Sequence, residues 1–148
     1  MSVATCNDMK EIADALELLT AQHDDITTLL ADLPDLDGER FALGLGALAD
    51  KIATHLVAEA ELRKTLHLAD PGDDRAIQRA LASIFALELD AREMRDRIRD
   101  LGDLFRKHAA AQEQGTFVAL AETIAPDVLE DVGARLSKWS SRASVLAA

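Results

Sequence analysis

The chain has 148 residues, of which 49% are hydrophobic and 29% charged, and its formal net charge is −11. This length predicts a single domain over 1–148, and the apolar share excludes a disordered chain. The acidic excess argues against nucleic acid as a partner. No uninterrupted apolar run reaches the roughly 18 residues of a membrane span, so we also expect no membrane partner.

The beginning of the sequence favours a cytoplasmic location. Its first residues, MSVATCNDMKE, contain neither the basic nor the apolar region of a signal peptide. Cys6 is the single cysteine and cannot form an internal disulfide. We therefore expect a protein of the reducing cytoplasm.

Helix is predicted almost throughout, because alanine and leucine dominate while β-branched runs and aromatic residues are few. The first helix is expected over about residues 8–32, where apolar residues recur at helical spacing. The turn at 34–38 ends it, and Asp37 is positioned to cap a second helix. The breaker sequence Asp-Pro-Gly at 70–72 ends the second helix.

The stretch from 73 to 114 has no proline and could be one long helix. Asp90 and Glu93, however, have the spacing of a capping box. We therefore predict a third helix that begins near Asp73 and a fourth that begins at Ala91.

Pro126 fits the first turn of a further helix, over about residues 126–139. The preceding four helices, over about 8–122, have short connections and amphipathic patterns. The expected fold is all-α, an antiparallel up-down-up-down four-helix bundle with an additional C-terminal helix.

The second and fourth helices repeat one pattern. Asp37 lies 18 residues before His55, and Asp90 lies 18 residues before His108. Apolar residues stand 14, 10, 7 and 3 positions before each histidine. The two histidines are therefore expected at the same height and on the same apolar face of their helices.

The first and third helices repeat more loosely. Apolar residues follow both His23 and Gln78 at +3, +6 and +7. This similarity predicts that Gln78 occupies the place that His23 has in the first half. The inward polar residues of the two helical hairpins should then meet near the middle of the bundle.

The first hairpin contains the residues of a metal half-site. His55 and Glu59 are four residues apart on one helix and can face one point, which His23 reaches from the neighbouring helix. Two imidazoles and a carboxylate suit non-haem Fe(II) with open positions for a small ligand. A carboxylate in an apolar interior needs a cation or a strong donor.

The second hairpin offers His108, Gln78 and Gln112. Gln112 follows His108 at +4, where Glu59 stands relative to His55. Glu113, at +5, points inward only if the helix bulges, which the nearby Gly115 favours. The two glutamines are expected more as hydrogen-bonding partners than as ligands, and Glu113 is weighed both as a ligand and as a solvated acid.

The chain resembles the hemerythrin-like, or HHE cation-binding, domains. The resemblance covers about residues 10–140 and rests on four segments: Gln22-His23 with Ile26 and Leu29-Leu30, His55-Leu-Val-Ala-Glu59, His108-Ala-Ala-Ala-Gln112-Glu113 with Phe117, and the stretch 124–136. It implies a four-helix bundle with two non-haem irons, bound by one histidine from each helix and bridged by two carboxylates. By this resemblance, His23, His55, Glu59 and His108 are metal ligands.

Two positions depart from the family pattern. Gln78 stands for the third-helix histidine and Gln112 for the fourth-helix carboxylate, although some relatives place that carboxylate at +5, as Glu113 is here. Without a second carboxylate, a pair of ferric ions would leave excess positive charge in an apolar core. One metal ion at His23, His55 and Glu59, with His108, is then favoured over a pair.

Three functions remain open on this pattern. The first is a non-haem iron protein with one or two Fe ions that binds or processes a small oxidant, namely dioxygen, peroxide or nitric oxide. The second is a metal-free interaction or regulatory module whose protein partner is unknown, and the third is a zinc site of the same residues. No general acid–base or nucleophile constellation is present, so whether the protein is an enzyme stays open.

Overall fold

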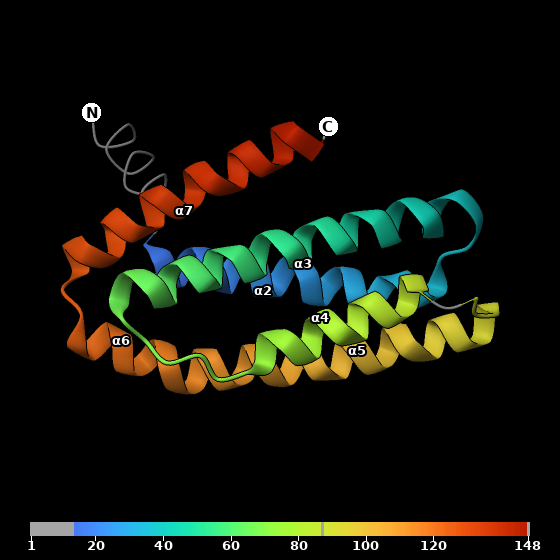
Figure 1. Cartoon of the computed structure of the whole chain (residues 1–148), viewed down its shortest axis with the longest axis horizontal. Helices are drawn as coiled ribbons and strands as arrows, with labels where there is room; N and C mark the ends of the chain where they lie inside the picture. Colours follow the sequence, from blue (N-terminus) through green and yellow to red (C-terminus); the bar gives the residue numbers. More distant parts are fainter. Residues whose placement is uncertain (1–13, 87, 148) are drawn as a thin grey trace, which may run out of the picture.

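The computed structural model describes residues 14–86 and 88–147, with side chains up to residue 138. The described chain is helical and contains no strand (Figure 1). Its helices are α2 (Ala15–Asp32), the 3₁₀ turn η1 (Leu33–Asp35), α3 (Gly38–Leu66), α4 (Asp73–Ala86), α5 (Ala91–Ala111), the π-helical turn η2 (Gln112–Thr116), α6 (Phe117–Thr123) and α7 (Pro126–Ala147).

Aspartate caps define two of the helix starts. Asp14 accepts a hydrogen bond from the Glu17 amide, and Asp90 accepts one from the Glu93 amide, both at 2.8 Å. Each side chain thereby satisfies a backbone N–H that has no partner within the helix. The predicted break at Asp90 is confirmed, whereas the predicted start of the first helix near residue 8 lies outside the described residues.

The ends of α3 use a different chemistry. Asp37 is extended at the N-cap but makes no side-chain capping bond, and Gly38 begins the helix with φ of 56°. His67 ends the helix in the left-handed conformation, with φ of 57°, and its side chain is exposed. This C-cap conformation stops α3 before the breaker at 70–72.

Helix α2 lies centrally and packs against α3, α5 and α7, while α4 packs on α5 (Figure 1). Two groups of buried apolar side chains result. The first includes Ile26, Ile52 and Phe105, and the second includes Leu19, Leu62 and Phe117. His23 on α2 lies between Leu19 of the second group and Ile26 of the first. His55 on α3 follows Ile52 of the first group, and His108 on α5 follows Phe105 of the same group.

The predicted repeat between the second and fourth helices is confirmed by burial. The buried residues at matching heights are Leu45, Leu48, Ile52 and His55 on α3, and Ile98, Leu101, Phe105 and His108 on α5. The common spacing therefore places both histidines on core-facing sides of their helices.

The inward face predicted for α4 is confirmed at Ile84 and is wrong at Gln78 and Phe85. Its buried side chains are Asp74, Ile77 and Ile84, whereas Gln78 and Phe85 are exposed. Adjacent side chains on a helix point about 100° apart, so a helix that buries Ile77 turns the neighbouring Gln78 outward. The larger transfer free energy of isoleucine favours this orientation.

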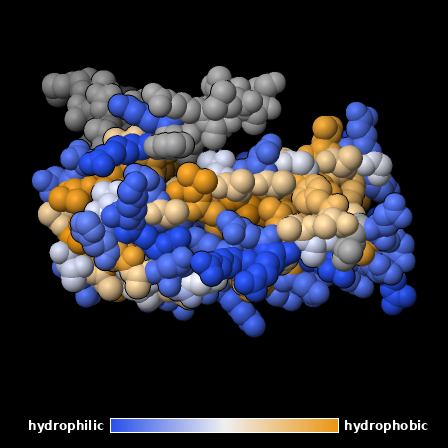
Figure 2. Space-filling view, in the orientation of Figure 1, coloured by the Kyte–Doolittle hydropathy of each residue, from blue (hydrophilic) through white to orange (hydrophobic). Residues whose placement is uncertain are grey.

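Gln78 and Phe85 line a groove of about 720 Å³ between α3 and α4. Apolar residues form a band across this face of the molecule (Figure 2). Gln78 is thus placed at the surface of the molecule and away from its interior.

Helix α3 contains a stretch whose length and mean hydropathy of 1.3 would allow it to cross a membrane. Within the described residues it is the one helix that meets this test, and 28% of the stretch is buried. The core helix of a folded protein passes the same test of length and composition.

Candidate metal centre

Four buried side chains from three helices converge on one point. They are His23 from α2, His55 and Glu59 from α3, and His108 from α5. Their ligand atoms all lie within 4.8 Å of one another. The Nε2 atoms of the three histidines lie 3.5, 2.6 and 2.8 Å, in chain order, from Glu59 Oε1.

The other ring nitrogen of each histidine faces an oxygen. His55 Nδ1 lies 2.7 Å from Gln22 Oε1, and His23 Nδ1 lies 3.2 Å from Glu113 Oε2. His108 Nδ1 lies 3.5 Å from an Asp73 carboxylate oxygen. Since a carboxylate or an amide oxygen only accepts, each Nδ1–H donates. The inward Nε2 of a neutral ring then carries a lone pair, as in a metal-binding histidine.

Neutral histidines in this tautomer direct three lone pairs toward a carboxylate. In the described part of the chain, His23 Nε2, His55 Nε2 and Glu59 Oε2 are buried without a hydrogen-bond partner. Buried acceptors that face one another are unfavourable unless a cation or a proton lies between them. The donor set of three imidazoles and one carboxylate fits a divalent transition metal.

In the cluster without a metal ion, the pKa values of Glu59, His55 and His108 are shifted, and not all in the same direction. Burial opposes ionisation of Glu59, but the three imidazoles that face it, His108 foremost, outweigh burial and hold the pKa of this carboxyl well below its usual range. Burial lowers the pKa of His55 more than Glu59 raises it. Burial also disfavours the charged form of His108, yet its hydrogen bond to Glu59 raises the pKa of this ring. Glu59 thus favours the protonated form of His108, and a metal ion would compete with that proton for Nε2.

Two phenylalanines shield the cluster from water. The Phe105 ring lies 5.9, 5.7 and 5.7 Å from the rings of His23, His55 and His108. Phe117 stacks on His23 at 5.8 Å with nearly parallel planes. The apolar surroundings lower the local dielectric and strengthen each electrostatic contact in the cluster.

The bulge that Glu113 needs in order to turn inward is present after His108 as the π-helical turn η2. A π turn has more residues per turn than an α-helix, so it rotates the side chains that follow. Glu113 is thereby directed to the outer nitrogen of His23, and its side chain is 33% exposed. The structure thus places it as a hydrogen-bond partner of His23, on the side away from Glu59 Oε1.

The two glutamines lie in different environments. Gln112 is half-buried, and its Oε1 is buried without a hydrogen-bond partner in the described chain. Gln112 and Glu59 line the same cavity of about 290 Å³. Gln78 lies on the exposed side of α4, so the expectation that it replaces a histidine beside the cluster is wrong.

Sequence reasoning missed three charged residues near the cluster. Arg63 lies 2.7 Å from Asp74 and 3.9 Å from Glu59 Oε2, and Asp73 contacts His108. Burial raises the pKa of Asp74 even though Arg63 pairs with it. Two features of the sequence could have indicated these residues. Arg63 follows Glu59 at the i,i+4 spacing, and an acidic pair stands at the start of α4.

No family model matches the chain, and no curated protein or solved structure matches it either. The fold and the cluster define a class on their own: a helical protein whose buried His23, His55, Glu59 and His108 can hold a metal ion.

Proposed function

We propose that the protein is a hemerythrin-like non-haem iron protein that binds or processes a small oxidant such as dioxygen, peroxide or nitric oxide. In this proposal α2, α3, α4 and α5 form an up-down-up-down bundle, and α7 is the additional helix. The observation that carries it is the convergence of three Nε2 atoms on Glu59, with each Nδ1 facing an oxygen.

The ligand set favours iron. Three imidazoles and one carboxylate are borderline ligands that suit Fe(II) and leave coordination positions for a small molecule. When bound, iron supplies the redox chemistry. Gln22, Glu113 and Asp73 orient the imidazoles, and Phe105 and Phe117 exclude water.

A single ion per chain is the proposed stoichiometry. Glu113 faces the outer nitrogen of His23, and Gln78 is exposed, so neither adds a ligand beside Glu59. Gln112 is neutral, and hard, high-valent iron prefers anionic oxygen. The cavity beside Glu59 has room for a small ligand of the metal.

Metal analysis after anaerobic Fe(II) loading tests the proposal. We expect about one iron per chain, and loss of iron in His55→Ala, because a ligand is removed. The matched control is His67→Asn, which changes an exposed histidine and keeps a residue type that tolerates positive φ. Iron below about 0.2 per chain in the unchanged protein would contradict the proposal.

The same sample separates iron from zinc. Zn(II) accepts this N/O set in tetrahedral geometry but is redox-inert. A visible absorption band that appears on addition of oxidant supports iron. A protein that retains only zinc after growth with both metals, and stays colourless, would refute the iron assignment.

A metal-free module is the second candidate. It is favoured by the 2.8 Å hydrogen bond between His108 and Glu59, which pairs a proton with the buried carboxylate without any metal. It predicts an unchanged melting temperature with Fe(II) or with EDTA. A large metal-dependent increase excludes it, since a ligand of the folded state must stabilise that state.

A further inference from the structure

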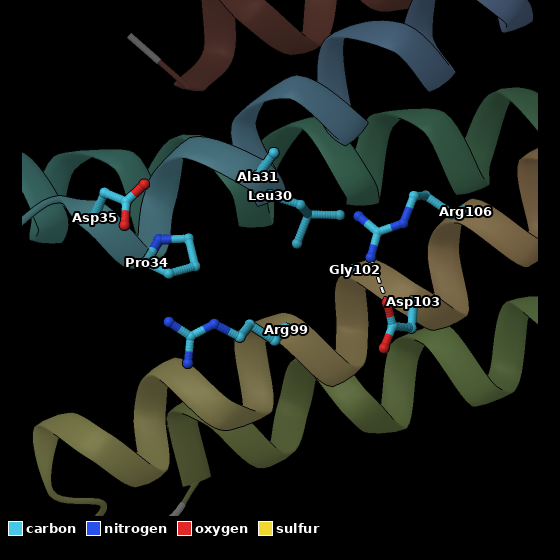
Figure 3. Close-up of a pocket in the computed structure, with 8 residues that line it drawn as sticks. All are labelled: Leu30, Ala31, Pro34, Asp35, Arg99, Gly102, Asp103 and Arg106. Carbon is cyan, nitrogen blue, oxygen red and sulfur yellow. Dashed lines mark hydrogen bonds and ion pairs between the residues drawn. The ribbon is translucent and has the colours of Figure 1, made fainter.

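A second cavity, of about 350 Å³, lies between the C-terminal part of α2, η1 and α5 (Figure 3). Leu30 and Pro34 form its apolar wall, and Arg99 and Arg106 line it from α5, with the guanidinium group of Arg99 toward Pro34 and that of Arg106 toward Leu30. None of the cluster residues lines it, so any ligand here is independent of the metal centre.

The two arginines are arranged around a glycine. Arg99 and Arg106 are seven residues apart, which places them two helical turns apart on one face of α5. Gly102 lies between them, and a Cβ there would come within 3.3 Å of Arg106 Nη1. The missing side chain thus lets the guanidinium of Arg106 lie close to the helix.

Most N–H donors of the Arg99 and Arg106 guanidinium groups make no hydrogen bond among the described contacts. Arg99 pairs with Asp96 at 3.4 Å, and Arg106 pairs with Asp103. A guanidinium has five N–H donors, and exposed ion pairs within one helix hold it only weakly.

The rim of the cavity is fixed by a third arginine. Arg95 Nε donates a 2.9 Å hydrogen bond to the Pro34 carbonyl, which ties α5 to η1. A site that is already formed loses less entropy when a ligand binds.

The charge of α5 contrasts with that of the chain. This helix contains six basic and four acidic residues, in a protein with a net charge of −11. The overall field repels anions, so an anion that binds here must do so through local contacts.

We propose that this cavity binds the phosphate group of a small molecule, or free phosphate. A phosphate presents at least three acceptor oxygens, which is enough to accept hydrogen bonds from the guanidinium groups of both Arg99 and Arg106. A carboxylate has only two oxygens, and a single guanidinium group can already bind both of them. Asp35, which also lines the cavity, can accept a hydrogen bond from a hydroxyl group of a phosphate monoester.

Calorimetric titration of the full chain at low ionic strength tests this proposal, with inorganic phosphate and glycerol 2-phosphate as probes. We expect binding that weakens at least about 10-fold in the Arg99→Ala/Arg106→Ala double variant and weakens with added salt. Tighter binding of glycerol phosphate assigns the site to a monoester, and tighter binding of inorganic phosphate assigns it to the free ion.

Two further variants serve as controls. Arg92→Ala removes an exposed arginine of the same helix that does not line the cavity, and should leave binding unchanged. Gly102→Ala should weaken binding less than the double variant does while the protein stays folded, because the added methyl comes within 3.3 Å of Arg106 Nη1 and shifts this flexible guanidinium only slightly. No binding of either probe, or equal binding in the double variant, would overturn the proposal; the second result would also reveal phosphate held elsewhere, including at a bound metal.

Discussion

At the residue scale, the cluster depends on contacts to both nitrogens of each ring. The inner nitrogens face Glu59, and the outer nitrogens face Gln22, Glu113 and Asp73. Such outer partners fix the tautomer and the orientation of a ligand histidine. A change to one of them should therefore alter metal affinity without removing a ligand.

Glu113→Ala tests this role directly. Loss of the acceptor at His23 Nδ1 should weaken Fe(II) binding about 10- to 100-fold, as measured by competition with a chelator, and Glu113→Gln should restore part of the affinity. Glu122→Ala, which removes an exposed acid of α6, is the control. Unchanged affinity in Glu113→Ala would show that this contact does not orient His23 for a metal.

The raised pKa of His108 predicts the pH dependence of metal binding. Glu59 stabilises the protonated ring, and a metal must displace that proton from Nε2. Affinity should therefore rise with pH through this raised pKa and level off above it. The measurement is the Fe(II)-induced increase in melting temperature between pH 6 and 8. An increase that is larger at pH 6 would contradict the assignment of His108 as a ligand.

Gln112→Glu should create a place for a second ion. The residue lines the cavity that Glu59 also lines, and its oxygen has no hydrogen-bond partner in the described chain. An anionic oxygen there should raise iron content from about one toward about two per chain. Gln78→Glu, on the exposed side of α4, should leave the metal count unchanged. Equal counts in the two variants would show that charge at position 112 does not limit the stoichiometry.

At the element scale, the caps of α3 and α5 differ although the sequence repeats. Asp90 makes a side-chain capping bond, and Asp37 makes none. Asp90→Ala should lower the free energy of unfolding by about 1 kcal/mol, and Asp37→Ala should lower it clearly less. Urea denaturation of both variants measures the difference, and equal losses would contradict the assigned caps.

The sequence was most informative where burial and local chemistry agree. The spacing of the apolar residues before His55 and His108 predicted their burial, and Asp90 predicted a helix start that periodicity alone did not indicate. The bulge after His108, which the sequence indicated only as a condition for Glu113 to point inward, is present as η2. Each of these features depends on interactions within a few turns of one helix.

The orientation of α4 could not be obtained in the same way. The match of Gln78 to His23 placed Gln78 on the inner face, whereas only its neighbour Ile77 is buried. The burial of Asp74 depends on Arg63 from another helix. Pairs between distant segments, such as His108 with Asp73 or His55 with Gln22, require the packed structure before they can be identified.

At the scale of the whole molecule, the cluster lies where the two buried apolar groups meet. His23 lies between Leu19 of one group and Ile26 of the other, and His108 lies between Phe117 and Phe105. A metal bound to His23, Glu59 and His108 would join α2, α3 and α5 at this junction. This arrangement links the proposed metal site to the stability of the complete fold.

X-ray absorption at the iron edge of the Fe(II)-loaded protein tests the central claim most directly. The account predicts the multiple-scattering signal of about three imidazoles together with oxygen ligands, and a reduced imidazole signal in His23→Ala, which removes one of the three ligands. Iron surrounded by oxygen alone, or a signal that is the same in the variant, would contradict the convergence of His23, His55, Glu59 and His108 on one ion.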